Sequence, residues 1–391
     1  MGSKKISGDF SSFNTVGAVL TLVGTIIGAG ILGIPYVFAK AGFFTGIIVI
    51  IFTSIFFVYM YLCLGEAILR TKGEHQLPGL AGKYLGKKGK KVMFIAMLLS
   101  SYGSLIAYLI ASGQAIHNLL SGIFNLPSFM NNPLFFSIAF FAFTSILILK
   151  GLNVIRDSEV VVTGFLVLIV VVIFFITFPN MQLSNLSKFR WDGLFIPYGA
   201  IFFAFMGFTT VPEAVRIMDK KKSLLPLVLI LSVIIPLIIY VLFSTSIVGV
   251  MGSNTSELAT IGLEDIFGIA MLFIGNFFLL FSVTTSFLAI GFAQQNVFTL
   301  DYVMPKFIAW FIACCVPFFL FLTLTNVMGF VEVLSASGVL FGGTMALLIL
   351  LLSYNAKKKG TRKPEYVVPM NVPLLILSIV ILIFGVVTLF A

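Results

Sequence analysis

Glycine and proline residues inside apolar segments are the residues of this sequence that are best placed to form a ligand-binding site. The apolar stretch 16–38 contains Gly28, Gly30, Gly33 and Pro35. Each glycine weakens a helix by about 1 kcal/mol relative to alanine, and Pro35 cannot donate a hydrogen bond to the carbonyl of Ile31. We therefore expect a broken helix, which exposes backbone N–H groups on one side of the gap and carbonyl groups on the other. Such groups can hold the carboxylate and the ammonium of a zwitterion without a charged side chain.

The same glycines allow two other interpretations. Gly24 and Gly28 form a G-x-x-x-G pair, which lets membrane helices pack closely together. Residues 28–33 also match the dinucleotide-binding pattern G-x-G-x-x-G. That site needs a preceding strand and an acidic residue about 20 positions later, whereas the next carboxylate here is Glu66. We therefore reject dinucleotide binding and keep close helix packing as an alternative.

A second stretch, residues 197–218, repeats the arrangement. It contains Gly199, Gly207 and Pro212, with hydroxyl groups from Thr209 and Thr210. No lysine, arginine, aspartate or glutamate lies near the middle of either stretch. A ligand bound there is expected to have an uncharged side chain, because an unpaired charge at the membrane centre costs at least about 2.5 kcal/mol.

The composition identifies an integral membrane protein that contains these stretches. Of the 391 residues, 60% are apolar and 10% are charged, with a mean hydropathy of +1.15. Soluble domains carry about 25% charged residues. Because one helical crossing needs about 20 apolar residues, the sequence predicts eleven spans. They cover residues 14–39, 42–69, 91–120, 133–150, 158–178, 194–217, 223–250, 265–297, 306–324, 327–353 and 372–390.

The two interrupted spans are the first and the sixth, five spans apart. Interruptions at equivalent positions predict two five-helix repeats of opposite orientation, residues 14–178 and 194–353. An extra helix follows at 372–390, and all of them form one transmembrane domain, 1–391. The two breaks are then expected to face each other near the middle of the membrane.

The distribution of basic residues predicts the orientation. If the spans alternate, all but three of the 24 lysines and arginines fall on one side, the exceptions being Lys40, Lys188 and Arg190. The positive-inside rule then places the N-terminus in the cytoplasm and the C-terminus outside the cell. This topology explains the net charge of +10 without a nucleic-acid partner. Residues 77–91 are too polar to cross and predict a short interfacial helix or loop.

Residues that would support an enzyme or a channel do not form a recognisable pattern. His75 and His117 are predicted on opposite sides of the membrane, and the three cysteines, Cys63, Cys314 and Cys315, lie in apolar stretches. An intramembrane enzyme would need paired aspartates, H-E-x-x-H or a serine with a histidine partner. A channel would show a repeated filter loop or rings of charge. We therefore expect no catalytic residues and no cofactor.

Several longer strings resemble a known family. GTIIGAGILGIPYVFAKAG, LPGLAGKYLGKKGK, FAFMGFTTVPE and FTLDYVMPK are similar to the amino acid/auxin permease family and its bacterial aromatic and hydroxy amino acid permease relatives. The resemblance covers the whole chain and is most specific in the first-span motif and in G-x-x-x-V-P-E, Gly207–Glu213. It implies the LeuT fold of the amino acid, polyamine and organocation superfamily. It also implies a plasma-membrane symporter of amino acids that works by alternating access.

By this resemblance, the substrate backbone binds at the two breaks. The implied residues are Gly28, Ala29, Gly30, Ile31, Leu32 and Gly33 in the first span, and Phe203, Ala204, Phe205, Met206, Gly207 and Phe208 in the sixth. The third span would line the pocket through Tyr102, Ser104 or Tyr108. The three phenylalanines of the sixth span would cover the ligand. Ordinary packing is the alternative for any one of the 44 phenylalanines in the chain.

The eighth span contains Thr285 and Ser286, in a stretch similar to the one that supplies two hydroxyl ligands to a sodium ion in LeuT-type symporters. The carbonyls of Gly28 and Ile31 would be the opposite ligands, and oxygen ligands suit a hard cation. Alternatively, the two hydroxyls bond back to the preceding turn. The fifth span lacks the lysine that some superfamily members use for proton coupling, so the sequence favours Na⁺ over that proton mechanism, and a permease coupled to H⁺ in another way remains the alternative.

Three carboxylates within spans have more than one credible role. Glu66 and Glu213 suit a gate or a helix end, and Arg216 lies one turn from Glu213. Glu332 suits the outer vestibule or a surface that faces water. A transporter-like receptor that senses amino acids remains an alternative to a transporter. We expect a neutral L-amino acid as substrate and a monomer in the lipid bilayer.

Overall fold

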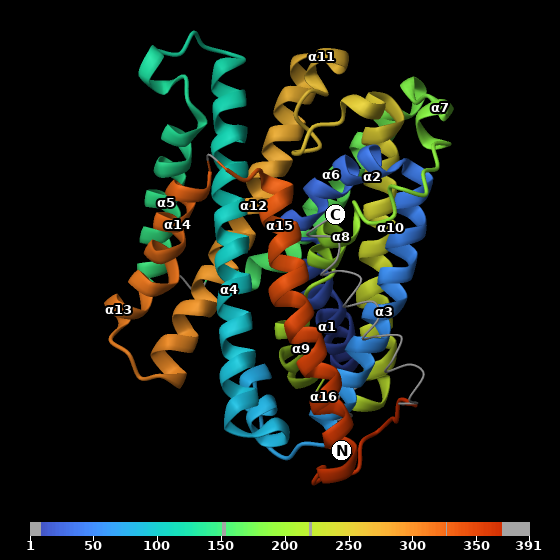
Figure 1. Ribbon diagram of the computed structural model, residues 1–391, viewed down its shortest axis with the longest axis vertical. Helices are drawn as coiled ribbons and strands as arrows, with labels where there is room; N and C mark the ends of the chain where they lie inside the picture. Colours follow the sequence, from blue (N-terminus) through green and yellow to red (C-terminus); the bar gives the residue numbers. More distant parts are fainter. Residues whose placement is uncertain (1–8, 151–153, 219–220, 326, 370–391) are drawn as a thin grey trace, which may run out of the picture.

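The computed structural model describes residues 9–150, 154–218, 221–325 and 327–369, and every regular element within these ranges is helical (Figure 1). Nine of the described helices are long and apolar enough to cross a membrane. A bent pair, Thr15–Ile27 with Ala29–Ala41, supplies a tenth crossing if it is counted as one span. The predicted eleventh helix, 372–390, lies outside the described residues.

The spans of the first half follow one another with short connections. They are formed by α1 (Asp9–Ile27), η1 (Ala29–Gly33) and α2 (Ile34–Ala41), then α3 (Phe43–Leu69), α4 (Leu77–Ser121), α5 (Pro133–Lys150) and α6 (Val154–Thr177). The shorter elements η2 (Ser128–Met130), η3 (Phe178–Asn180) and α7 (Leu183–Leu186) lie in the connections.

The second half begins with another divided span, formed by α8 (Tyr198–Ala204), η4 (Phe208–Thr210) and α9 (Val211–Ile217). It continues with η5 (Lys222–Leu224), α10 (Leu225–Met251), η6 (Gly252–Asn254), α11 (Glu264–Phe267), α12 (Ile269–Asn296) and η7 (Val297–Asp301). The last two described spans are α13 (Lys306–Trp310), η8 (Phe311–Cys315) and α14 (Val316–Leu324), and α15 (Phe330–Ala336), η9 (Ser337–Gly342) and α16 (Gly343–Lys359).

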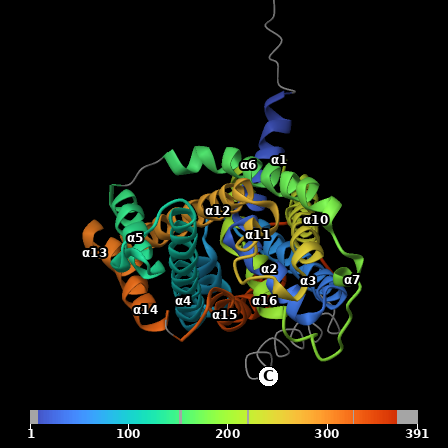
Figure 2. The same cartoon turned by 90° about the horizontal axis from the view of Figure 1, so that it is seen from above.

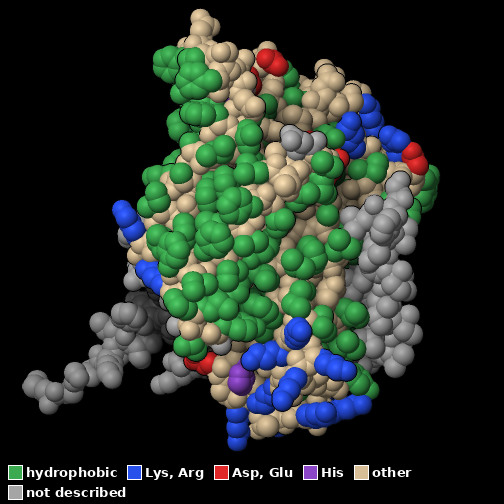
Figure 3. Space-filling view, turned by 60° about the vertical axis from the view of Figure 1, so that its left-hand side comes forward, with side chains coloured by type: hydrophobic (Ala, Val, Ile, Leu, Met, Phe, Trp, Pro, Cys, Tyr) green, Lys and Arg blue, Asp and Glu red, His purple; other side chains and the backbone are tan. Residues whose placement is uncertain are grey.

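The divided helices lie inside the bundle. Figure 2, seen along the long axis, shows α2 near the middle, with α3 and α10 on one side and α4, α5, α13 and α14 on the other. The outer helices can be apolar all round because they face protein on one side and lipid on the other. Accordingly, Phe57 is fully buried whereas Phe52 on the same helix is 66% exposed. Figure 3 shows the resulting belt of hydrophobic side chains on the outer surface.

The segment expected to be a short interfacial helix or loop is a helical arm joined to the third span. Residues 77–121 are one helix apart from Gly86, whose φ of 76° and ψ of −171° are not helical. This conformation favours glycine, since a side chain would strain the backbone there. The arm and the span therefore meet at a bend rather than at a loop.

Candidate functional site

The first span is interrupted where its glycines predict. Helix α1 ends at Ile27, Gly28 has the non-helical angles φ −25° and ψ −158°, and the chain bends by 42° before it continues as η1 and α2. Pro35 lies in the first turn of α2, where its missing N–H has no helical partner to lose. The glycines thus make the break, and the proline starts the next helix.

The sixth span is divided in the same way. Helix α8 ends at Ala204, and the next helical turn starts only at Phe208. Between them Gly207 has φ −131° and ψ 22°, outside the helical region. Pro212 again lies in the first turn of the helix that follows, α9. Each divided span therefore ends one helix and begins another near its middle.

The two breaks touch. A Cβ atom on Gly30 would lie 2.8 Å from the Cα of Ala204 and 3.5 Å from the ring of Phe203. A Cβ atom on Gly207 would lie 2.9 Å from the side chain of Ile26. Distances under 3.0 Å leave no room for a side chain, so the glycines are what allow the two backbones to come together.

Tyr240 of α10 connects the two breaks. Its hydroxyl lies 2.6 Å from the carbonyl oxygen of Ile26 and 2.9 Å from that of Ala204, and the residue is fully buried. These carbonyls belong to the C-terminal ends of α1 and α8, where they have no partner within their own helix. One hydroxyl proton therefore serves the freed carbonyls of both broken helices.

Tyr61 of α3 supports the sixth-span break alone. Its hydroxyl donates to the carbonyl of Phe205 at 2.8 Å and accepts from the N–H of Gly207 at 2.7 Å. Both bonds are buried, so the hydroxyl replaces the helical hydrogen bonds that the break removes. Tyr61 and Tyr240 could not be identified from the sequence, because both lie within continuous apolar helices and have no local signal.

The third and eighth spans bring hydroxyl groups to the first break. A Cβ atom on Gly28 would lie 2.9 Å from Ser286 Oγ. The hydroxyl of Tyr108 lies near Ser286 and Ser104. Thr285 instead donates to the carbonyl of Phe281 at 2.9 Å, which is the back-bonded arrangement that the sequence left open. Of these two neighbouring residues, Ser286 is the one whose hydroxyl reaches the first break.

The side chains of three predicted binding residues contact other parts of the protein. The hydroxyl of Tyr102 donates to the carbonyl of Ile312 in η8 at 2.7 Å. The rings of Phe205 and Phe208 pack against Phe57 of α3, with centroids 5.6 and 5.4 Å away. The role of these three side chains at a bound ligand stays a prediction. Phe203 is the predicted aromatic residue that reaches Gly30.

A loop between α10 and α12 covers the first break on the side opposite the basic residues. The N–H of Ala259 donates to the carbonyl of Leu32 in η1 at 3.2 Å, and Ala259 is fully buried. Glu332 accepts a hydrogen bond from the N–H of Gly329 at the start of α15. The exposed Glu332 therefore caps the start of α15.

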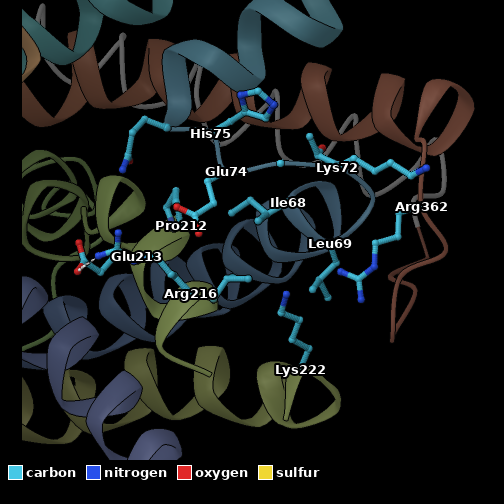
Figure 4. Close-up of a pocket in the computed structure, with 14 residues that line it drawn as sticks. Ile68, Leu69, Lys72, Glu74, His75, Pro212, Glu213, Arg216, Lys222 and Arg362 are labelled. Carbon is cyan, nitrogen blue, oxygen red and sulfur yellow. Dashed lines mark hydrogen bonds and ion pairs between the residues drawn. The ribbon is translucent and has the colours of Figure 1, made fainter. Parts of the chain in front are cut away.

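The opposite, basic end contains a pocket of about 590 Å³ (Figure 4). It is lined by the end of α3, the loop 71–76 and α9, together with Lys222 and Arg362. Glu213 and Arg216 form an ion pair of 3.0 Å at this pocket, as their spacing suggested. The pocket lies beside α9, the basic-end half of the divided sixth span.

Glu66 forms a buried junction at the same end. Its carboxylate is 1% exposed and contacts Arg70 Nε at 2.7 Å, Lys357 Nζ at 3.2 Å and the N–H of Val368 at 2.8 Å. These partners come from the cap residue after α3, from α16 and from the segment after α16. Burial raises the pKa of the neighbouring Tyr366 above its ordinary value, so its phenol remains a neutral donor.

Two divided helices in contact within a bundle of membrane-spanning helices are the arrangement of the LeuT fold. The solved structure of MhsT in complex with L-phenylalanine has this fold. It matches with a TM-score of 0.73 over 96% of this chain and 98% of that chain, at 14% sequence identity. The all-α polytopic fold predicted from the sequence is thereby confirmed.

The sequence matches the tryptophan/tyrosine permease family over residues 12–390, and the chain belongs to this family. The family resemblance seen in the sequence is confirmed, and the family is one of membrane permeases rather than enzymes. Glutamine transporter 2 of Aliivibrio fischeri is 28% identical over 62% of this chain and 63% of that protein. Tyrosine-specific transport system 1 of Haemophilus influenzae is 24% identical over 61% of this chain and 59% of that protein. The matched region thus spans about six tenths of these relatives.

Proposed function

We propose that this chain is a secondary transporter that binds a neutral L-amino acid between its two broken helices. The observation that carries the proposal is the contact of the breaks at Gly30 and Ala204, with freed carbonyls of both helices converging on Tyr240. Carbonyls at the ends of α1 and α8 suit an ammonium group, and N–H groups at the start of η1 suit a carboxylate. The relatives named for glutamine and tyrosine, and the phenylalanine bound to MhsT, agree with an uncharged side chain.

Alternating access would use the two ends of the bundle differently. The bond from Ala259 to Leu32 covers one side, whereas the pocket beside α9 lies at the basic end. With the N-terminus and the basic end in the cytoplasm, this arrangement corresponds to a conformation closed to the outside. We place the protein in the plasma membrane as a monomer, with its C-terminus outside the cell.

Sodium is the coupling ion that we propose, with Ser286 as the main side-chain ligand. Its hydroxyl lies beside Gly28, where the first break frees carbonyl groups, and oxygen ligands of this kind suit a hard cation. Thr285 and the carbonyl of Ile31 complete the proposed set. The hydroxyl proton of Thr285 points back along α12, which leaves its oxygen lone pairs available to a cation.

Uptake of radiolabelled amino acids into proteoliposomes tests the binding site. Gly30→Val should abolish uptake, because the added side chain forces the two backbones apart at the contact with Ala204. Gly17→Val is the matched control, since a Cβ atom on Gly17 of α1 meets nothing within 4 Å. Normal uptake by Gly30→Val would contradict the site.

Substrate and coupling are tested with the same vesicles. Competition by all twenty amino acids should rank neutral ones first, and a stronger effect of lysine, arginine or glutamate would contradict the proposed substrate class. Replacing sodium with choline at fixed pH should abolish uptake. Uptake that is independent of sodium but depends on a pH gradient would indicate proton coupling instead. Binding of the amino acid without uptake would indicate a sensor.

A further inference from the structure

The two arms of the bend at the start of α4 pack closely against each other. Gly86 has a φ of 76°, and a Cβ atom on Gly89 would lie 2.4 Å from the Cβ of Leu85. On the other arm, a Cβ atom on Gly82 would lie 3.4 Å from the side chain of Lys90. Glycines on both arms therefore let the arm 77–85 fold closely against the start of the third span.

The arm is also fixed to the body of the protein. Its apolar residues Leu77, Leu80, Ala81 and Tyr84 are at most 3% exposed. The hydroxyl of Tyr84 lies 2.7 Å from Thr71 Oγ1, and the amide of Asn355 in α16 donates to the carbonyl of Tyr84 at 3.2 Å. The bend is consequently part of the folded core and not a loose surface loop.

Five lysines project from this fixed bend, and we call them the lysine platform. They are Lys83, Lys87, Lys88, Lys90 and Lys91, and all of them are exposed. None of the five has an ion-pair partner among the residues that the structure describes. Figure 3 shows basic side chains gathered at this end, directly below the hydrophobic belt.

The position of the platform along α4 corresponds to the level of lipid headgroups. Val92 and Ile95 are 46% and 40% exposed and begin the surface that faces the hydrocarbon. Residues at positions i, i+3, i+4 and i+7 of a helix share one face, and this spacing joins Lys88, Lys91, Val92 and Ile95. A headgroup that contacts the lysines would thus have its acyl chains beside Val92 and Ile95.

Like charges held together on a rigid frame repel one another unless an anion neutralises them. The positive-inside rule requires only that the charges lie on this side, and a flexible loop would satisfy it. We propose that the lysine platform binds the phosphate groups of anionic phospholipids. The charge complementarity and the continuity with the lipid-facing surface of α4 identify the lipid headgroup as the ligand. This proposal does not depend on the transported substrate.

Lipid binding to the purified protein in detergent tests the proposal. The melting temperature and the number of lipids retained in native mass spectrometry are measured with phosphatidylglycerol, phosphatidylcholine or inorganic phosphate. The test variant changes Lys87, Lys88 and Lys91 to glutamine. The matched control changes Lys358, Lys359 and Lys363, three exposed lysines at the same end of the molecule, to glutamine.

The wild type should prefer phosphatidylglycerol to phosphatidylcholine. Because each lysine near an anionic surface contributes about 1 kcal/mol, the platform variant should lose this preference by about tenfold or more, whereas the control variant keeps it. Equal losses in both variants, or no preference in the wild type, would overturn the proposal. Stabilisation by inorganic phosphate equal to that by phosphatidylglycerol would show a phosphate site and not a lipid site. A platform variant with an unchanged melting temperature in phosphatidylcholine shows that the loss is not a folding defect.

Discussion

Replacing Tyr240 with phenylalanine removes a single hydroxyl group at the junction of the two broken helices and so tests its contribution. The ring would keep its edge-on contact with Phe205, whose centroid is 5.4 Å away. The hydroxyl group, whose oxygen lies 2.6 and 2.9 Å from the carbonyl oxygens of Ile26 and Ala204, would be lost. The variant therefore leaves two buried carbonyls unpaired at little change in packing.

The expected effect has two parts. An unpaired buried acceptor costs about 1–3 kcal/mol, and two acceptors are left unpaired, so we expect the substrate-free variant to lose about 2–6 kcal/mol in its free energy of unfolding. If the ammonium of the substrate binds these same carbonyls, its N–H groups supply the missing donors. The amino acid should then raise the melting temperature of Tyr240→Phe by more than it raises that of the wild type.

The assay is thermal or denaturant-induced unfolding of the purified protein with and without a saturating neutral amino acid. Tyr366→Phe is the control, because it removes a hydroxyl that donates to the carbonyl of Leu62 at the basic end, away from both breaks. The control should be less stable than the wild type and show the wild-type response to substrate. An unchanged substrate response in Tyr240→Phe would refute the assignment of the two carbonyls to the ammonium site.

Three further changes test other contacts. Glu66→Gln should lower the free energy of unfolding by about 3–5 kcal/mol in denaturant titrations, because it removes the anion from a buried ion-pair junction; a change below 1 kcal/mol would contradict the role of this junction. Thr45→Val should cost about 1–3 kcal/mol by the same measurement, since its buried hydroxyl both donates to and accepts from the backbone of Arg190; stability equal to that of the wild type would show that these bonds contribute nothing. Ser286→Ala should reduce the sodium dependence of uptake more than Thr285→Val does, and the reverse order would move the proposed ligand to Thr285.

The position of the breaks could be predicted because its cause is local. Gly28 and Gly207 weaken the helix at their own positions, and both lie outside helical geometry in the structure. The membrane-spanning helices could be predicted equally well, since each of them is an apolar run in the sequence. The contact between Gly30 and Ala204 followed from a global argument, the opposite orientation of two five-span halves.

The side chains around the breaks could not be predicted with the same success. Successive residues on a helix point about 100° apart, so a small error in helix rotation exchanges lining residues for packed ones. Phe203 reaches the break whereas Phe205, two positions later, packs against Phe57. Tyr102 and Tyr108 are likewise on one helix, yet Tyr102 contacts η8 and Tyr108 lies beside Ser286.

The tyrosines that complete the site were missed because their function depends on partners far along the chain. Tyr61 meets Phe205 across 144 positions, and Tyr240 meets Ile26 across 214. A break in a buried helix is stable only if neighbouring helices supply the lost hydrogen bonds, and tyrosine does so with an apolar ring and no charge. A carbonyl oxygen has two lone pairs, so a carbonyl bonded to Tyr240 can still accept from an ammonium group. The same backbone atoms can thus be satisfied in the empty site and bind the substrate when it arrives.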